Sequence, residues 1–252
     1  MSTRTSVARI WIAVDALERS ADALGAVTRL AAGRVVELAG LFVEDADLLR
    51  LAGWPAATEK RLFEASLQPF GGPGFEAALR AQAAALQRRV DALARDIGVP
   101  WSFRTVRGRV VQQALSMAES DDWIVLAGAS TSVQLRLCPA SPPTRPMLWL
   151  LPEDAPALAR LLEAAARYDP RGAAERRVVL PDDPAGAAQV RASAAAAGAA
   201  LRVASVPELL TRVGCGPRVA GELVLMTRAA GAADPERLRN LLRRGAAPLV
   251  LV

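Results

Sequence analysis

Histidine is absent from this sequence, and cysteine occurs only as Cys138 and Cys215. The two cysteines form no CxxC pair and have no histidine beside them, so a zinc site of the usual Cys/His kind is excluded and a disulfide framework is disfavoured. The lack of histidine also excludes every mechanism that uses a histidine base. Because no other nucleophile with a base is recognisable, we expect no metal site and no catalytic residues, and predict that the chain is not an enzyme.

Long hydrophobic runs are also lacking, although 52% of the residues are hydrophobic. Alanine inflates that fraction, and no window approaches the roughly 18 uncharged apolar residues of a membrane helix. The apolar run before Asp15 is shorter than the about 7–15 residues of a secretory signal. We expect a soluble, cytoplasmic protein without a membrane span.

Lysine and aromatic residues are scarce as well. Lys60 is the only lysine among 31 basic residues, aromatic residues make up 4% of the chain, and the formal net charge is +5. Nucleic-acid-binding proteins usually combine arginine with lysine and with stacking aromatics. We therefore interpret the arginine clusters at 88–109 and 237–244 as solvated helix faces. A nucleic-acid partner is disfavoured, and a protein partner is the expected one.

The chain does contain a regular alternation of short apolar runs and longer amphipathic segments, which favours an α/β fold with a mostly parallel sheet. The runs typical of strands lie at 9–14, 34–43, 101–108, 122–128, 147–152, 176–183, 201–207, 221–227 and 247–252. The segments with helical periodicity lie at 16–32, 74–97, 109–119, 153–168, 185–197, 208–213 and 234–245.

Proline is densest in "CPASPPTRP", residues 138–146, and the alternation starts again after it. This break predicts two domains, 1–140 and 147–252. An internal duplication is the simplest reason for the restart. The predicted architecture is two tandem α/β units, each a five-stranded, mainly parallel sheet flanked by helices, with the second unit abbreviated.

Several stretches of the first half, in this order and at appropriate spacing, resemble the universal stress protein family in its tandem-domain form. They are "RIWIAVDALERSADAL", "VVELAGLFVEDADLLRLAGWPAATE", "VPWSFRTVRGRVVQQAL" and "DDWIVLAG". Over 147–252 the resemblance depends on the order of the elements and on the closing "APLVLV". It implies five-stranded parallel sheets and, in many members of the family, binding of ATP or AMP.

The resemblance also implies where a nucleotide would bind: at an acid after the first strand, at the end of the second strand, and at a glycine-rich loop after the fourth. The corresponding residues here are Asp15, then Leu41, Phe42 and Val43, then Gly128, Ser130 and Thr131. Glycines in such a loop let backbone N–H groups approach the phosphates, and the next helix adds its partial positive charge.

The sequence departs from the family pattern in this loop. Thr131 stands where the second glycine is expected, and the final glycine-hydroxyl pair has no counterpart. The alternating "VQLRL" at 133–137 predicts a strand where the helix should follow. We therefore interpret Gly128, Ser130 and Thr131 as the remnant of a phosphate loop.

Structural roles are favoured for the other candidate residues. A carboxylate between a strand and a helix is typical of an N-cap, which is our interpretation of Asp15 and of Asp154, the latter followed by Pro156. Phe42 is interpreted as a core residue. The acids Glu44, Asp45 and Asp47 could hold magnesium, but they are interpreted as a solvated loop.

The expected function is a regulatory or scaffolding role in the bacterial stress response, without catalysis and without a cofactor. The alternative is a sensor that binds AMP or ATP through Asp15, the region of Phe42 and the backbone of 128–131.

The final stretch "APLVLV" lacks clean alternation, which predicts a strand covered on both faces. An unpaired edge beside such apolar side chains would be an aggregation hazard. We expect 247–252 to pair with a strand of the first half, with 132–138 as the first candidate, or with another chain in a dimer.

Overall fold

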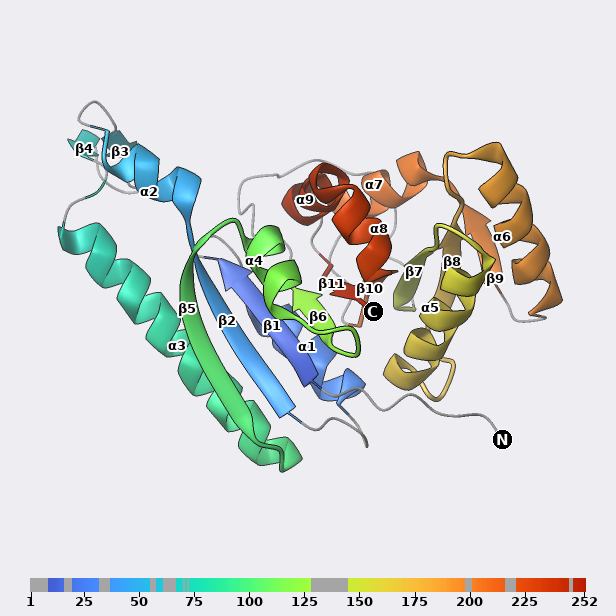
Figure 1. Ribbon diagram of the computed structural model, residues 1–252, viewed down its shortest axis with the longest axis horizontal. Helices are drawn as coiled ribbons and strands as arrows, with labels where there is room; N and C mark the ends of the chain where they lie inside the picture. The colour runs from blue at the N-terminus through green and yellow to red at the C-terminus, as the bar shows by residue number, and fades with distance from the viewer. Residues whose placement is uncertain are drawn as a thin grey trace.

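The computed structural model describes residues 9–15, 20–31, 37–54, 58–60, 67–69, 71, 73–127, 145–197, 201–215, 221–244 and 247–252 (Figure 1). Its first half comprises β1 (Arg9–Asp15), α1 (Ser20–Leu30), β2 (Glu37–Asp45), α2 (Ala46–Ala52), β3 (Thr58–Lys60), β4 (Leu67–Pro69), α3 (Pro73–Ile97), β5 (Trp101–Gly108), α4 (Val110–Met117) and β6 (Trp123–Leu126). Its second half comprises β7 (Met147–Leu151), α5 (Ala155–Tyr168), β8 (Glu175–Val179), α6 (Pro184–Ala196), β9 (Leu201–Ala204), α7 (Val206–Cys215), β10 (Leu223–Met226), α8 (Arg228–Ala233), α9 (Pro235–Arg244) and β11 (Leu249–Leu251).

The main sheet is a single nine-stranded layer in the order β5-β2-β1-β6-β11-β10-β7-β8-β9. Neighbouring strands are parallel, except that β11 and β6 are antiparallel. The predicted α/β class with a mainly parallel sheet is therefore confirmed. The prediction of two five-stranded sheets differs from what is observed, because the strands of both halves join in one layer through the β6–β11 pair.

Helices cover both faces of this sheet, and the strands alternate their side chains between the two faces. On one face, Ile10 and Ile12 of β1 pack in a buried cluster that includes residues of α1, α3, α5 and α6. On the other face, Trp11 and Ala13 belong to a cluster that includes residues of α4, α7 and α9. Each cluster contains residues from both halves, so the core is continuous across the molecule.

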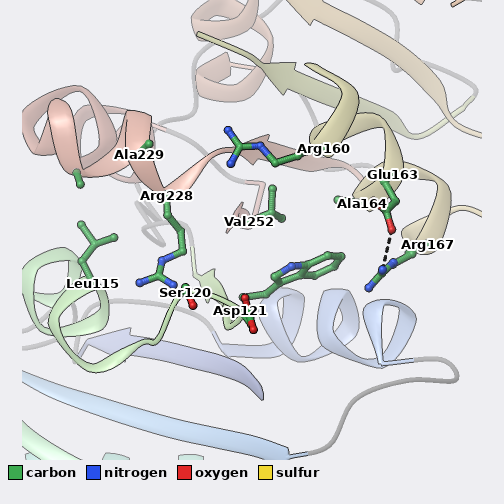
Figure 2. A pocket seen from close by; sticks show the side chains of 12 residues that line it. Leu115, Ser120, Asp121, Arg160, Glu163, Ala164, Arg167, Arg228, Ala229 and Val252 are labelled. Atoms are coloured by element: carbon green, nitrogen blue, oxygen red, sulfur yellow. Dashed lines mark hydrogen bonds and ion pairs between the residues drawn. The ribbon is translucent and has the colours of Figure 1, made fainter. Parts of the chain in front are cut away.

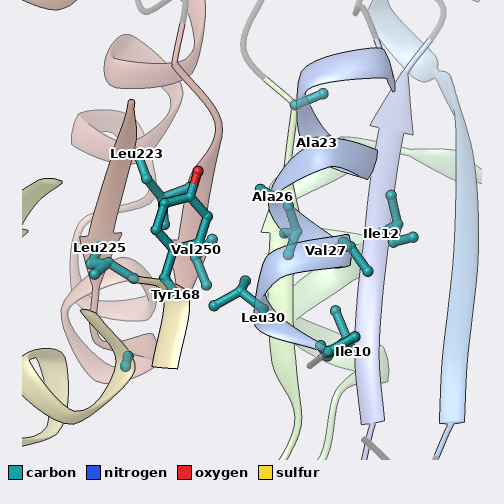
Figure 3. Packing of buried hydrophobic residues seen from close by; sticks show 14 of the residues in the cluster. Ile10, Ile12, Ala23, Ala26, Val27, Leu30, Tyr168, Leu223, Leu225 and Val250 are labelled. Carbon is teal, nitrogen blue, oxygen red and sulfur yellow. The ribbon is translucent and has the colours of Figure 1, made fainter. Parts of the chain in front are cut away.

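Helix α1 shows how the two halves share one core (Figure 3). Its buried residues Ala23, Ala26, Val27 and Leu30 occur at helical spacing, so they form one apolar face. That face lies over Ile10 and Ile12, and Leu30 points toward Tyr168 and Val250 of the second half (Figure 3). Helix α1 therefore contacts α5 as well as β1.

The C-terminal strand lies inside the sheet. Val250 pairs with Val125 of β6 on one edge and with Leu225 of β10 on the other, and it is 0% exposed. The prediction of a strand covered on both faces is confirmed. The first-half partner is 123–126 rather than 132–138, which lies outside the described residues. Because both edges are occupied within the chain, self-association through this strand finds no support.

Four elements were not predicted from periodicity: α2, the strands β3 and β4, which form an antiparallel pair, and α8. Each is only a few residues long, so it contains too few periods to form a recognisable pattern. None of the described helices combines the length and apolar character needed to cross a bilayer.

Candidate functional site

The carboxyl edge of the first half is where the sequence predicts a nucleotide. Asp15 ends β1, and its backbone lies in register with Val43 of β2, so the first two candidate segments are side by side. Residues 16–19 lie outside the described part of the chain, so the N-cap role of Asp15 stays a prediction. Gly128, Ser130 and Thr131, together with 133–137, also lie outside it, and the loop that would complete the site is therefore not described.

Leu41, Phe42 and Val43 at the end of β2 are core residues. Their relative exposures are 0%, 2% and 0%, respectively. Phe42 packs in the cluster that includes α1 and α3, whereas Leu41 and Val43 pack in the cluster that includes α4. A ligand at this edge would therefore meet their backbone and not their side chains.

The acids at the end of β2 and the start of α2 are bound by arginines or by helix N–H groups. Glu44 Oε2 lies 2.9 Å from Nε of Arg107, and Asp47 Oδ2 lies 3.2 Å from Arg109. Asp45 Oδ1 accepts hydrogen bonds from the N–H groups of Asp47 and Leu48 at 2.7 and 3.2 Å, so it is the N-cap of α2. Among the described residues, no group of three His, Cys, Asp or Glu residues is arranged to hold a metal ion.

At the corresponding edge of the second half, Asp154 and Thr227 cap the helices that follow β7 and β10. Asp154 Oδ1 accepts from the N–H of Ala157 at 2.7 Å, and a proline stands in the first turn of α5, which confirms the predicted N-cap. Thr227, which is 0% exposed, donates its hydroxyl to Glu153 Oε1 at 2.6 Å and caps α8 through Ala230. The other oxygen of Glu153, Oε2, is buried and accepts no hydrogen bond from the described residues.

Two buried tryptophan–carboxylate pairs were not found from the sequence. Trp11 donates its indole N–H to Asp122 at 3.0 Å, and Trp149 donates to Glu222 at 3.2 Å. In both pairs the tryptophan is the third residue of its strand, and the acid directly precedes another strand. The signal in the sequence was a charged residue next to an apolar run, which is too common to single out.

Arginines accompany both pairs. The Cζ atom of Arg9 lies over the ring of Trp11, 5.7 Å from the ring centroid, and Nη1 of Arg9 lies 3.8 Å from Oδ2 of Asp122. In the second half, the Cζ atom of Arg177 lies 5.3 Å from the ring centroid of Trp149, and Nη2 of Arg212 lies 3.2 Å from Oε2 of Glu222. Desolvation raises the pKa of Glu222, while the hydrogen bond from Trp149 and the two arginines oppose that rise.

A pocket of about 530 Å³ lies where the two halves meet (Figure 2). Leu115, Ser120, Asp121 and Trp123 of the first half line it. From the second half it is lined by Arg160, Glu163, Ala164 and Arg167 of α5, by Arg228, Ala229 and Ala232 of α8, and by Val252. The lining is chemically mixed: it has three guanidinium groups, two carboxylates, a hydroxyl and an apolar remainder.

No family model matches the chain, and no curated protein matches it significantly. The function is therefore inferred from the geometry of the described residues.

Proposed function

We propose that this chain is a non-catalytic protein of the universal-stress type, built from two related α/β units, with a regulatory or scaffolding role in a bacterial stress response. The units correspond to 1–140 and 147–252. In this proposal the carboxyl edge of the first unit no longer binds ATP or AMP, and the protein acts through its surfaces.

The repeated strand order supports two related units. From one edge of the sheet inward the order is β5-β2-β1-β6, and from the other edge inward it is β9-β8-β7-β10. The register also repeats, because Trp11 pairs with Ile124 and Trp149 pairs with Val224. In both cases the residue opposite the tryptophan is the second residue of the strand that begins directly after the partner acid. Two unrelated halves would not be expected to share order, register and a buried hydrogen bond.

The observation that carries the non-catalytic role is that the acids at the end of β2 and the start of α2 already have partners. Glu44 and Asp47 lie in ion pairs with arginines, and Asp45 caps a helix. A general base must reach the proton that it removes, and a magnesium site needs oxygen ligands that are not already neutralised. Binding of magnesium by these acids would have to break these contacts first.

Isothermal titration with Mg·ATP and with AMP, together with a phosphate-release assay, tests this proposal. We expect no phosphate release and a dissociation constant weaker than about 1 mM, because the sequence lacks the second glycine and the final glycine-hydroxyl pair of a phosphate loop. A micromolar constant that Asp15→Ala abolishes, and that the exposed α3 control Asp96→Ala leaves unchanged, would replace this proposal with the nucleotide sensor.

A further inference from the structure

The pocket between the two halves contains an arginine whose charge is not balanced by a carboxylate. Arg228 donates through Nη2 to the carbonyl of Ala118 at 2.7 Å and through Nη1 to the carbonyl of Glu119. Carbonyl oxygens carry no net charge, and among the described residues Arg228 makes no ion pair. Its guanidinium group is therefore held in a fixed position while its positive charge remains available.

A second arginine in the pocket is only loosely paired. Arg160 lies 3.8 Å from Glu153 Oε1, which is beyond hydrogen-bond distance, and its side chain is 58% exposed. The same oxygen already accepts the hydroxyl of Thr227 at 2.6 Å. Figure 2 shows the side chains of Arg160 and Arg228 projecting from α5 and α8 into the same pocket.

The third arginine of the pocket, Arg167, is already paired with a carboxylate of the lining. Arg167 forms an ion pair with Glu163, with Nη2 and Oε1 2.8 Å apart (Figure 2). Its Cζ also lies over Trp123, 5.3 Å from the centroid of the ring. This pair neutralises one arginine and one carboxylate of the lining. Leu115 and Val252 add apolar surface, and Ser120 and Asp121 add a hydroxyl and a carboxylate.

We propose that this pocket binds a phosphorylated, hydroxyl-bearing small molecule, with its phosphate between Arg160 and Arg228. Guanidinium groups match phosphate oxygens in geometry and charge, and a donor already held by other contacts loses little freedom on binding. Ser120 and Asp121 would take the hydroxyl groups of the ligand. The volume falls within the roughly 300–1,000 Å³ that small-molecule sites occupy.

The site is distinct from the carboxyl edge of the first half, and the inference does not depend on the proposed function. Its lining comes from both halves, so an occupied pocket would stabilise their association. A ligand that binds only the folded chain raises the melting temperature, and the rise continues as the ligand concentration increases above the dissociation constant.

Titration calorimetry at low salt, with ribose 5-phosphate, inorganic phosphate and unphosphorylated ribose as probes, tests the proposal. We expect both phosphate-containing probes to bind, with ribose 5-phosphate the tighter of the two, and ribose alone to give no heat. Loss of a charge-assisted contact in Arg160→Gln should weaken binding about tenfold or more. Ala229→Glu, which places a carboxylate in the pocket in the first turn of α8, should weaken it as strongly.

Two matched controls remove the same charge or add the same carboxylate outside the pocket. Arg80→Gln changes an exposed arginine of α3, and Ala233→Glu changes an exposed alanine of α8 that does not line the pocket. Both should bind like the wild type, and all four variants should keep its circular dichroism spectrum. The proposal is wrong if the wild type gives no heat with ribose 5-phosphate up to about 10 mM, or if Arg160→Gln and Ala229→Glu bind as the controls do. Binding that Asp15→Ala abolishes and Arg160→Gln does not would place the ligand at the carboxyl edge instead.

Discussion

Leu251→Ala should destabilise both halves of the molecule at once, although Leu251 belongs to the second half. Its side chain is 0% exposed, and its backbone lies between Ile124 of β6 and Met226 of β10. Its methyl groups also pack on α8, where Gly231 approaches them closely: a Cβ on Gly231 would lie 3.3 Å from Cδ2 of Leu251.

The size of the expected loss of stability depends on how rigid the neighbours of Leu251 are. Leu→Ala in a core costs about 2–5 kcal/mol, with the larger values where the surroundings cannot collapse into the cavity. Paired strands on both sides make collapse difficult here, so we expect about 3–5 kcal/mol. A domain in the middle or upper part of the usual range of roughly 5–15 kcal/mol would stay folded. At a urea dependence of about 3 kcal/mol per molar, the unfolding midpoint should fall by about 1 to 1.7 M.

Tryptophan fluorescence can report on the first half alone, because Trp149 is the only one of the five tryptophans that lies in the second half. Urea unfolding would therefore be compared between Trp149→Phe and Trp149→Phe/Leu251→Ala. A single transition that moves to lower urea is expected, since the core is continuous across the junction. A first-half transition that does not move, or two separate transitions in circular dichroism, would refute this prediction.

Three further predictions concern single contacts. Trp11→Phe removes the indole donor of buried Asp122 and should cost about 1.5–3 kcal/mol beyond the lost ring volume; an unchanged urea midpoint would contradict this. The pKa of Glu222 is raised in the folded state above its ordinary value of 4.5. Protonation of Glu222 therefore stabilises the folded state fully below pH 4.5, and this stabilisation is lost as the pH rises through the folded pKa. Glu222→Gln should therefore be at least as stable as the wild type at pH 7, with the difference disappearing near pH 4 in urea titrations; a variant that is less stable at pH 7 would contradict the sign. Gly40→Ala would bring a Cβ to 2.6 Å from Cδ2 of Phe103, so thermal unfolding should show that the folded state loses about 1–3 kcal/mol of stability. Phe103→Leu in the same chain should partly restore that stability. No loss in the single variant would show that the ring moves aside freely.

The order of strands and helices could be predicted from the sequence because it depends on local patterns. The strand predicted at 101–108 coincides with β5, and the long helix predicted at 74–97 coincides with α3 within one residue. The cap at Asp154 was also predictable, since an acid followed by proline in the first turn is a frequent start of a helix. Short elements and the pairing of distant strands were not predictable in this way.

The candidate site at the carboxyl edge was only partly predictable. That Asp15 and Val43 lie side by side follows from the parallel pairing of consecutive strands. That Glu44 and Asp47 are bound by arginines does not follow from the sequence, because Arg107 and Arg109 lie more than sixty residues further along the chain. Many arginines were available, and the register of β2 with β5, which pairs Glu44 with Arg107, is what brings this part of the chain to the acids.

The pocket between the two halves could not be predicted from either half alone. The reason is the antiparallel β6–β11 pair, which joins the halves. At this joint the carboxyl end of β11 lies beside the amino end of β6, so Val252 is brought next to Trp123. Strand β10 is parallel to β11 and ends at the same edge, so Arg228 begins α8 there and its guanidinium reaches the carbonyls of 118 and 119. In parallel sheets, ligands bind beyond the carboxyl ends of the strands. Here the carboxyl end of the second half is enclosed by the segment that leads into the last described strand of the first half. A ligand at this position would contact both halves, which a site at the carboxyl edge of one half would not.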